Sequence, residues 1–255
     1  MAVVEHERRG IVEILRFNRP EARNAISPEV STEMAELLDA AEADPGVRAV
    51  VLTGSGPVFS AGADLKVVAQ GRGDEIAGAR GGFAGLVMRD FPKPIIAAVN
   101  GPALAGGFEI VLACDLVVAA DTARFGVPEV QRGLMAAAGA LIRLPKRVPL
   151  AIALEMAMTG DPIEADRALA LGLVNRVVPA DRVLDEAVAI AERIGENSPV
   201  SVRVSRRLVK EALDLSEAEA WVRNDERALE VFRGGDAIEG ATAFAEKRKP
   251  VWKST

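Results

Sequence analysis

The sequence predicts an α/β core followed by a helical carboxyl-terminal part. Up to about residue 178, short apolar runs of strand length alternate with stretches of helical periodicity, which is typical of a sheet covered by helices. After Pro179 the pattern is mainly helical, over residues 181–196, 199–213, 216–232 and 236–246. We therefore expect an α/β core over residues 1–195 and a helical region over residues 196–255. A chain of 255 residues is long enough for one large domain with such an appendage.

The first elements have clear boundaries. Residues 2–9 and 11–17 read as two strands separated by Gly10. Ser27 and Pro28 are typical of a helix N-cap followed by proline at the first helical position, and this helix is predicted to end near Ala43. Residues 48–54 form an apolar run bounded by glycine and are predicted to be a buried strand.

Residues 70–82 are rich in Gly, Arg and Ala, and we interpret them as a mobile connection before a helix at about 83–90. Further strands are expected at 94–99, 116–120, 124–126 and 173–178, and further helices at 106–114, 149–158 and 164–170. Asp181 and Ser216 are predicted helix caps, and Glu219 completes a capping box with Ser216.

Composition excludes several classes of function. The net charge of −6 and an aromatic content of 4% argue against nucleic-acid binding. No signal-peptide pattern and no apolar run of membrane-spanning length occur, so a cytoplasmic protein without a membrane partner is expected. Cys114 is the single cysteine; a disulfide framework is therefore impossible, and Cys114 is predicted to be a core residue.

His6 is the single histidine, and it is predicted to lie on a surface strand. The body of the chain therefore has neither a Ser-His-Asp triad nor a histidine-based metal site. We expect no bound metal, and we expect carboxylates and main-chain amides to carry any catalysis.

One stretch, Asn100–Glu109, combines features of a reactive site. It follows the apolar run at 94–99 and enters an apolar helix through Gly106 and Gly107. A helix start presents unpaired N–H groups and partial positive charge, and glycine there allows a ligand to approach the backbone. Glu109 lies three residues into the helix, on the same side as the Gly106 amide.

A second strand, glycine turn and helix start occur at residues 48–66. Because the carboxyl ends of parallel strands meet at one sheet edge, the amides of Ala63 and Gly106 are predicted to converge as an oxyanion hole for a thioester carbonyl. Glu109 and Glu129 are the candidate acid and base. Lys66 follows the first turn and is a candidate phosphate contact.

Each of these features also has a plain structural interpretation. A Gly-Gly helix start is often only close packing. Glu109 taken alone is equally consistent with a buried residue that has a polar partner, and Glu129 with a surface residue after a proline.

The chain resembles the crotonase (enoyl-CoA hydratase/isomerase) family along nearly its full length. The resemblance rests on Asn18–Pro20 with Asn24-Ala25, Phe59–Lys66, Asn100–Glu109, Phe125–Glu129, Thr159-Gly160 with Gly172–Val174, and Phe244–Arg248. It implies a spiral of ββα units, a helical carboxyl-terminal region that forms trimers, and an assembly that is a trimer or a dimer of trimers.

The resemblance also implies a coenzyme A thioester substrate. Its carbonyl would bind between the amides of Ala63 and Gly106. Further positions match the family's CoA contacts: Ala22, Arg23, Ala61, Asp64, Leu65, Lys66, and, reaching a neighbouring subunit's CoA, Phe244 and Lys247.

Hydratases of the family keep glutamates at the positions of Glu109 and Glu129, the first activating water and the second protonating the α-carbon. The resemblance therefore implies reversible hydration of a trans-2-enoyl-CoA to a 3-hydroxyacyl-CoA, with no cofactor beyond the substrate's own coenzyme A. The alanine-rich segment 133–145 and the tail 236–253 look especially like the carnitinyl-CoA dehydratase branch. Carnitinyl-CoA dehydratase, enoyl-CoA isomerase and a non-catalytic acyl-CoA-binding protein are the alternatives.

Overall fold

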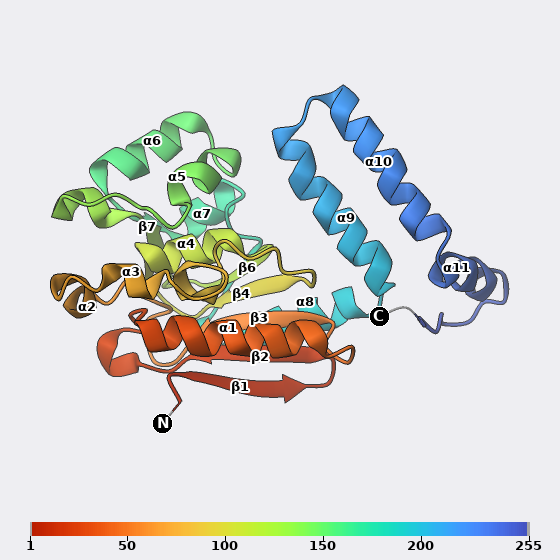
Figure 1. The fold of residues 1–255 in the computed structure, drawn as a ribbon, viewed down its shortest axis with the longest axis horizontal. Coiled ribbons are helices and arrows are strands. Elements are labelled where there is room, and N and C mark those ends of the chain that lie inside the picture. The colour runs from red at the N-terminus through yellow and green to blue at the C-terminus, as the bar shows by residue number, and fades with distance from the viewer. Residues whose placement is uncertain (1, 254–255) are drawn as a thin grey trace.

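The computed structural model describes residues 2–253 and confirms a mixed α/β fold (Figure 1). The larger sheet has the strand order β1-β2-β3-β4-β6-β9. Its strands are β1 (Val4–Arg9), β2 (Val12–Phe17), β3 (Ala49–Gly54), β4 (Ile95–Val99), β6 (Leu116–Ala120) and β9 (Arg176–Val178). The β1–β2 pair is antiparallel, and the pairs from β2 to β9 are parallel.

A smaller sheet has the order β5-β7-β8. It consists of β5 (Ala103–Leu104), β7 (Arg124–Gly126) and β8 (Ile163–Glu164). The strand at 124–126 is confirmed, whereas β5 and β8 are too short to be recognised by periodicity.

Helices cover the sheets and form the carboxyl-terminal part. They are α1 (Pro28–Ala43), α2 (Leu65–Ala69), α3 (Gly73–Ile76), α4 (Gly106–Ala113), α5 (Ala140–Arg143), α6 (Leu150–Thr159), α7 (Ala165–Ala170), α8 (Val183–Gly195), α9 (Pro199–Glu211), α10 (Glu217–Phe232) and α11 (Gly235–Ala245). Helix α8 packs on β3, β4 and β6, and α1 on β1 and β2. In Figure 1, α9 and α10 stand beside the sheet-containing body, and α11 lies at the lower end of α10.

Helix α1 shows how the sequence sets an element. The Ser27 side chain accepts a hydrogen bond from the Val30 N–H, and Pro28 occupies the first turn, as predicted. Val30, Met34 and Leu38 recur at helical spacing and are buried against the sheet. The Ser216 capping box with Glu219 at the start of α10 is also confirmed.

Three local predictions are wrong. Residues 83–90 are not a helix but contain a 3₁₀ turn (Phe83–Gly85), because Gly81, Gly82, Ala84 and Gly85 all have positive φ angles that a helix cannot contain. The connection at 70–82 contains the short helix α3, and Ile76 of this helix is buried. The Ile76 carbonyl accepts a hydrogen bond from the Ser31 hydroxyl at 2.7 Å.

Asp181 is not the cap of α8. It lies in a 3₁₀ turn (Ala180–Arg182), and α8 begins after Arg182 without a side-chain cap.

Candidate active site

Two glycine turns lie side by side at the carboxyl edge of the larger sheet. Strands β3 and β4 are parallel neighbours, so the segments that follow them leave the sheet at the same edge. An isolated bridge pairs Ser60 with Ala103. A Cβ atom built on Gly62 would lie only 2.7 Å from the Gly106 nitrogen. The structure therefore brings the Ala63 and Gly106 segments together.

Both segments present an unused main-chain N–H. The Ile26 N–H donates to the Gly62 carbonyl at 2.8 Å, and the Asp64 N–H donates to the Ile26 carbonyl at 2.9 Å. Ala63 lies between these two bonds, so its own N–H points away from Ile26. Within residues 2–253, neither the Ala63 N–H nor the Gly106 N–H has a hydrogen-bond acceptor. Two such donors on adjoining segments can bind a carbonyl oxygen.

The glycines at the start of α4 make room for protein atoms. A Cβ atom on Gly106 would lie 2.5 Å from Cζ of Phe83, and one on Gly107 would lie 2.2 Å from the Ser60 carbonyl oxygen. A ligand was expected to approach the backbone at these two glycines, but the groups that lie close to them are the Phe83 ring and the Ser60 backbone. The aromatic ring next to the Gly106 amide was not expected from the sequence.

Ala105 holds the turn in a strained backbone conformation. It is the N-cap of α4, with φ 52° and ψ −131°, a region that side-chain-bearing residues rarely adopt. Its N–H donates to the Gly126 carbonyl at 2.9 Å, and its carbonyl accepts from the Phe108 and Glu109 N–H groups. These bonds fix the helix start against β7, and the strain is concentrated beside the Gly106 amide.

Glu109 is buried, with 3% of its surface exposed. Its Oε1 accepts a hydrogen bond at 3.0 Å from the N–H of Ala140, the first residue of α5. Burial raises the pKa of Glu109, while the main-chain amides of Ala140 and Ala138 and the positive charge of Arg143 oppose that rise. These partners favour the ionised carboxylate within an otherwise apolar setting.

Glu129 follows β7 in a 3₁₀ helix (Pro128–Arg132) and is half-buried. Its Oε2 is buried and has no hydrogen-bond partner within the described residues. Burial and, to a smaller extent, the negative charge of Glu109 together raise the pKa of Glu129 to about 7. The two carboxyl groups thus act on each other, and their different partners favour a protonated Glu129 beside an ionised Glu109.

The loop containing Ala22 and Arg23 lies beside the first glycine turn. Arg23 has a left-handed φ of 53°, and its carbonyl accepts a hydrogen bond from the Ala61 N–H at 3.0 Å. Three residues predicted to contact CoA therefore adjoin the Ala63 segment.

Asp64, Leu65 and Lys66 form the start of α2. The Asp64 side chain accepts from the Lys66 N–H at 3.1 Å and pairs with Arg19 at 3.0 Å, so it has a structural role as the helix N-cap. Leu65 and Lys66 are exposed at the start of this helix.

Phe244 and Lys247 are not brought to this chain's own glutamates. Phe244 is 87% exposed near the end of α11, and Lys247 follows that helix. Figure 1 places α11 beyond α9 and α10, away from α2 and α4.

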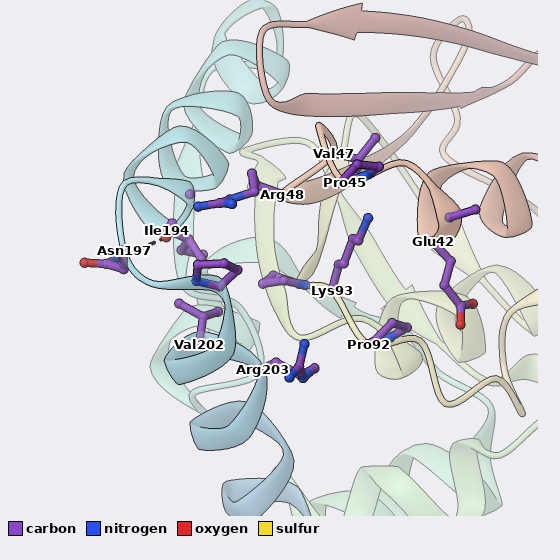
Figure 2. Close-up of a pocket in the computed structure, with 14 residues that line it drawn as sticks. Glu42, Pro45, Val47, Arg48, Pro92, Lys93, Ile194, Asn197, Val202 and Arg203 are labelled. Carbon is purple, nitrogen blue, oxygen red and sulfur yellow. Dashed lines mark hydrogen bonds between the residues drawn. The ribbon is translucent and has the colours of Figure 1, made fainter. Parts of the chain in front are cut away.

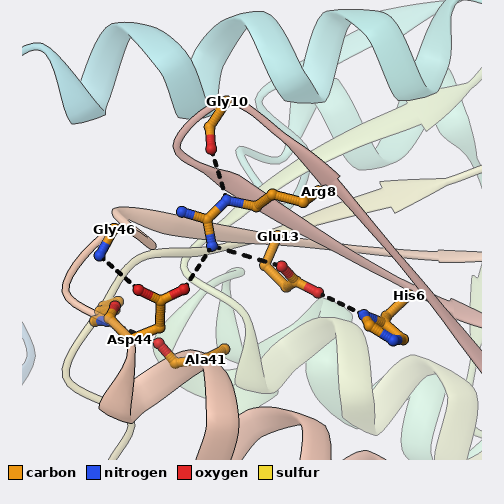
Figure 3. Close-up of polar contacts among 8 residues, drawn as sticks. His6, Arg8, Gly10, Glu13, Ala41, Asp44 and Gly46 are labelled. Carbon is orange, nitrogen blue, oxygen red and sulfur yellow. Dashed lines mark hydrogen bonds and ion pairs between the residues drawn. The ribbon is translucent and has the colours of Figure 1, made fainter.

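The remaining reactive side chains lie elsewhere. His6 is exposed on β1, with Nδ1 3.1 Å from Oε1 of Glu13, in a surface network that also includes Arg8 and Asp44 (Figure 3). Cys114 is fully buried, and burial raises the pKa of its thiol to about 12. Both predictions, a surface histidine and a core cysteine, are confirmed.

A cavity of about 230 Å³ opens at the opposite, amino edge of the sheet (Figure 2). It is lined by residues that precede β3 and β4, such as Arg48 and Lys93, and by the connection from α8 to α9, including Asn197. None of the predicted site residues lines it.

Within residues 2–253, no cluster of three or more His, Cys, Asp or Glu side chains is arranged to hold a metal ion. Among the same residues, no helix is both long enough and apolar enough to cross a membrane.

Three residues of the site could not be identified from the sequence: Phe83, Ala105 and Arg143. The positions of Phe83 and Arg143 depend on contacts between distant segments. The only local signals are Gly82, directly before Phe83, and Gly139, four residues before Arg143.

The chain is similar to known proteins along nearly its full length. The model of the enoyl-CoA hydratase/isomerase family matches residues 6–255. A carnitinyl-CoA dehydratase of Proteus mirabilis is 41% identical over 251 residues, which cover 96% of each chain. The crystal structure of an enoyl-CoA hydratase from Mycobacterium tuberculosis H37Rv superposes with a TM-score of 0.95 at 44% identity. That of a carnitinyl-CoA hydratase from Mycobacterium avium superposes with a TM-score of 0.80 at 45% identity. Both comparisons cover 100% of each chain.

Proposed function

The chain belongs to the enoyl-CoA hydratase/isomerase family, and we propose that it adds water reversibly to a trans-2-enoyl-CoA to give a 3-hydroxyacyl-CoA. The observation that carries this proposal is the pair of coupled carboxyl groups, Glu109 and Glu129, next to two unused main-chain N–H groups. A hydro-lyase needs a base for water, an acid for carbon, and donors for the developing oxyanion.

The two N–H groups of Ala63 and Gly106 donate to the thioester carbonyl oxygen. When water attacks the β-carbon, the π electrons of the double bond move toward that oxygen and form an enolate. Preorganised donors stabilise this charge more than they stabilise the neutral substrate, and therefore lower the barrier.

Ionised Glu109 accepts a proton from the attacking water while the new C–O bond forms at the β-carbon. Protonated Glu129 then donates its proton to the α-carbon as the enolate collapses. The net result is addition of H and OH across the double bond. Transfer of the proton from Glu109 back to Glu129 restores the starting state, and no redox partner or metal takes part in these steps.

We further propose that the coenzyme A portion binds along Ala22, Arg23, Ala61 and the exposed start of α2, with Lys66 at a phosphate. The protein then supplies no separate cofactor. Phe244 and Lys247 would contact the CoA bound to a neighbouring copy, since they do not approach this chain's own site. This requires a homo-oligomer, a trimer or a dimer of trimers.

A second candidate is hydration of an acyl group that carries a trimethylammonium head, as in carnitinyl-CoA dehydratase. The observation that favours it is the 41% identity with the Proteus mirabilis enzyme over 96% of both chains. The hydro-lyase chemistry is the same, and the two candidates differ only in the distal end of the acyl pocket.

A panel of enoyl-CoA thioesters of increasing chain length, together with crotonobetainyl-CoA, tests the proposal. We expect loss of the enoyl thioester absorbance with at least one simple acyl substrate. Preference for crotonobetainyl-CoA would select the second candidate, and movement of the double bond without water addition would indicate an isomerase. Tight binding without hydration or α-proton exchange would contradict an enzyme and indicate an acyl-CoA-binding protein.

A further inference from the structure

Arg143 sits beside Glu109 without being part of the proposed proton transfers. It is the last residue of α5, whose first residue, Ala140, donates its N–H to Glu109. The guanidinium is half-buried. Its Nη1 donates to the Ala138 carbonyl at 3.3 Å, and its Nη2 donates to the Val87 carbonyl.

The backbone around Arg143 is shaped to hold this guanidinium. Gly139 has a φ of 109°, and a Cβ atom on it would lie 2.1 Å from Nη1 of Arg143. Any other residue at position 139 would both strain the turn and displace the guanidinium. The Ala138–Ala140 turn that binds Glu109 therefore wraps closely around the Arg143 side chain.

The second contact of Arg143 joins a different part of the site. Val87 belongs to the 81–88 turn, which the Met88 N–H closes by donating to the Gly81 carbonyl at 2.8 Å. The same turn carries Phe83, whose ring packs against Gly106. Arg143 thus links the turn that binds Glu109 to the turn whose Phe83 ring packs against Gly106.

Few other charges act on Glu109. Arg143 comes from α5 and Glu129 from the 3₁₀ helix after β7, and α4 itself carries no charged residue besides Glu109. Asp115 follows the far end of α4 and is paired with Arg206 and Lys210. Arg143 is therefore the cation whose charge acts on the Glu109 carboxylate.

We propose that Arg143 is a positioning residue that orders the Ala138–Ala140 and 81–88 turns around Glu109 and places a cation near that carboxylate. This inference rests on the proposed function for its kinetic consequences, but the ionisation of Glu109 can be measured without any substrate.

Arg147 provides a matched control. It lies four residues further on, burial also lowers the pKa of its guanidinium, and its Nη2 donates to the Cys114 carbonyl at 2.6 Å. Its partner is at the opposite end of α4 from Gly106. Arg147→Met therefore removes a comparable buried cation without removing the one whose charge acts on Glu109.

The test compares Arg143→Met, Arg143→Lys and Arg147→Met in the full chain. We expect Arg143→Met to lower kcat about 10- to 100-fold with a smaller change in KM. We also expect the acid limb of its pH–rate profile to move to higher pH, since loss of a neighbouring cation raises a carboxyl pKa. In Arg143→Lys the acid limb should return most of the way to its wild-type pH, and in Arg147→Met it should stay at the wild-type pH.

A ¹³C NMR titration of the glutamate carboxyl groups compares the pKa of Glu109 among the same variants in the protein without substrate. Glu109→Gln serves to assign the Glu109 signal. An upward shift of the Glu109 titration in Arg143→Met alone supports the inference, even if no enoyl-CoA is hydrated and the proposed function fails. An unchanged titration in a folded Arg143→Met variant, or equal changes in the Arg143→Met and Arg147→Met variants, would overturn it.

Discussion

Glu109 and Glu129 differ in their partners, and this difference assigns their roles in the proposed reaction. Glu109 accepts a main-chain hydrogen bond and feels the charge of Arg143, whereas Oε2 of Glu129 is buried and has no hydrogen-bond partner among residues 2–253. An ionised carboxylate can take the proton of water, and a protonated carboxyl can give one to carbon. The residues were identifiable from the sequence, but the asymmetry between them depends on the Ala138–Ala140 turn, which approaches from another part of the chain.

Replacing either carboxyl group tests these roles. Glu109→Gln and Glu129→Gln are each expected to lower kcat for hydration by about 10²- to 10⁴-fold, because each removes one proton transfer while conserving volume. Far-UV circular dichroism should remain unchanged. Glu164→Gln, at an exposed residue of β8 that is paired with Arg124, is the matched control and should retain full activity. A wild-type rate in either active-site variant would refute the mechanism.

The pH dependence of activity follows from the pKa of Glu129. Because Glu129 must be protonated to act as the acid, the hydration rate should fall as pH rises through about 7. The descending limb of kcat against pH measures this value. A flat profile from roughly pH 6 to pH 9, the range that brackets the expected limb, would show that Glu129 is not the acid.

The same pKa makes stability depend on pH. A carboxyl whose pKa is raised on folding stabilises the folded state at low pH, and that contribution is lost as pH rises through the folded-state value, about 7 for Glu129. Glu129→Gln cannot ionise, so its Tm relative to wild type should increase between pH 5 and pH 8, roughly the interval in which Glu129 titrates. A constant Tm difference across this interval would contradict the pKa assigned to Glu129.

At the scale of elements, the start of α4 depends on a close fit between three segments. The strand, glycine turn and helix were predictable because their apolar runs and glycines are local signals. The strained Ala105 and the 81–88 turn were not, since both are held by partners far away in the sequence: Gly126 for Ala105, and Arg143 for Val87. The helix expected at 83–90 is replaced by this turn, whose positive φ angles at Gly82, Ala84 and Gly85 are not compatible with a helix.

Packing of Phe83 on Gly106 can be measured by a double-mutant cycle. Gly106→Ala should reduce the free energy of unfolding by about 1–3 kcal/mol, because its Cβ would overlap the Phe83 ring. Phe83→Leu provides space, so the double variant should be more stable than additivity predicts by at least about 0.5 kcal/mol. Gly235→Ala, where a Cβ meets no atom within 4 Å, is the control. Strict additivity would mean that the two residues do not touch.

At the scale of the whole molecule, the carboxyl-terminal helices expose apolar side chains that a monomer would leave in water. Large exposed hydrophobic residues on α9, α10 and α11 include Val209, Trp221, Val222, Leu229, Phe232, Ile238 and Phe244. Exposed apolar surface of this kind is typical of protein interfaces. Helical periodicity predicted these helices, but a single sequence does not show which of their faces meets another copy.

Light scattering coupled to size exclusion should therefore give a trimer or a hexamer. In that assembly, Phe244→Ala and Lys247→Ala should raise KM for the thioester about tenfold with less effect on kcat, because they remove binding contacts distant from the reacting atoms. Ala241→Ser, on the same helix and also exposed, is the control. A fully active monomer would contradict both the assembly and these contacts.

The central claim is that Glu109 and Glu129 act with the Ala63 and Gly106 amides to add water across an enoyl thioester. Its most direct test is incubation of the wild-type protein with crotonyl-CoA in H₂¹⁸O, followed by mass spectrometry of the product. We predict 3-hydroxybutyryl-CoA with ¹⁸O at the β-carbon, and greatly reduced incorporation in Glu109→Gln and Glu129→Gln. Incorporation that is unaffected by both substitutions, or a product with a shifted double bond and no ¹⁸O, would contradict the claim.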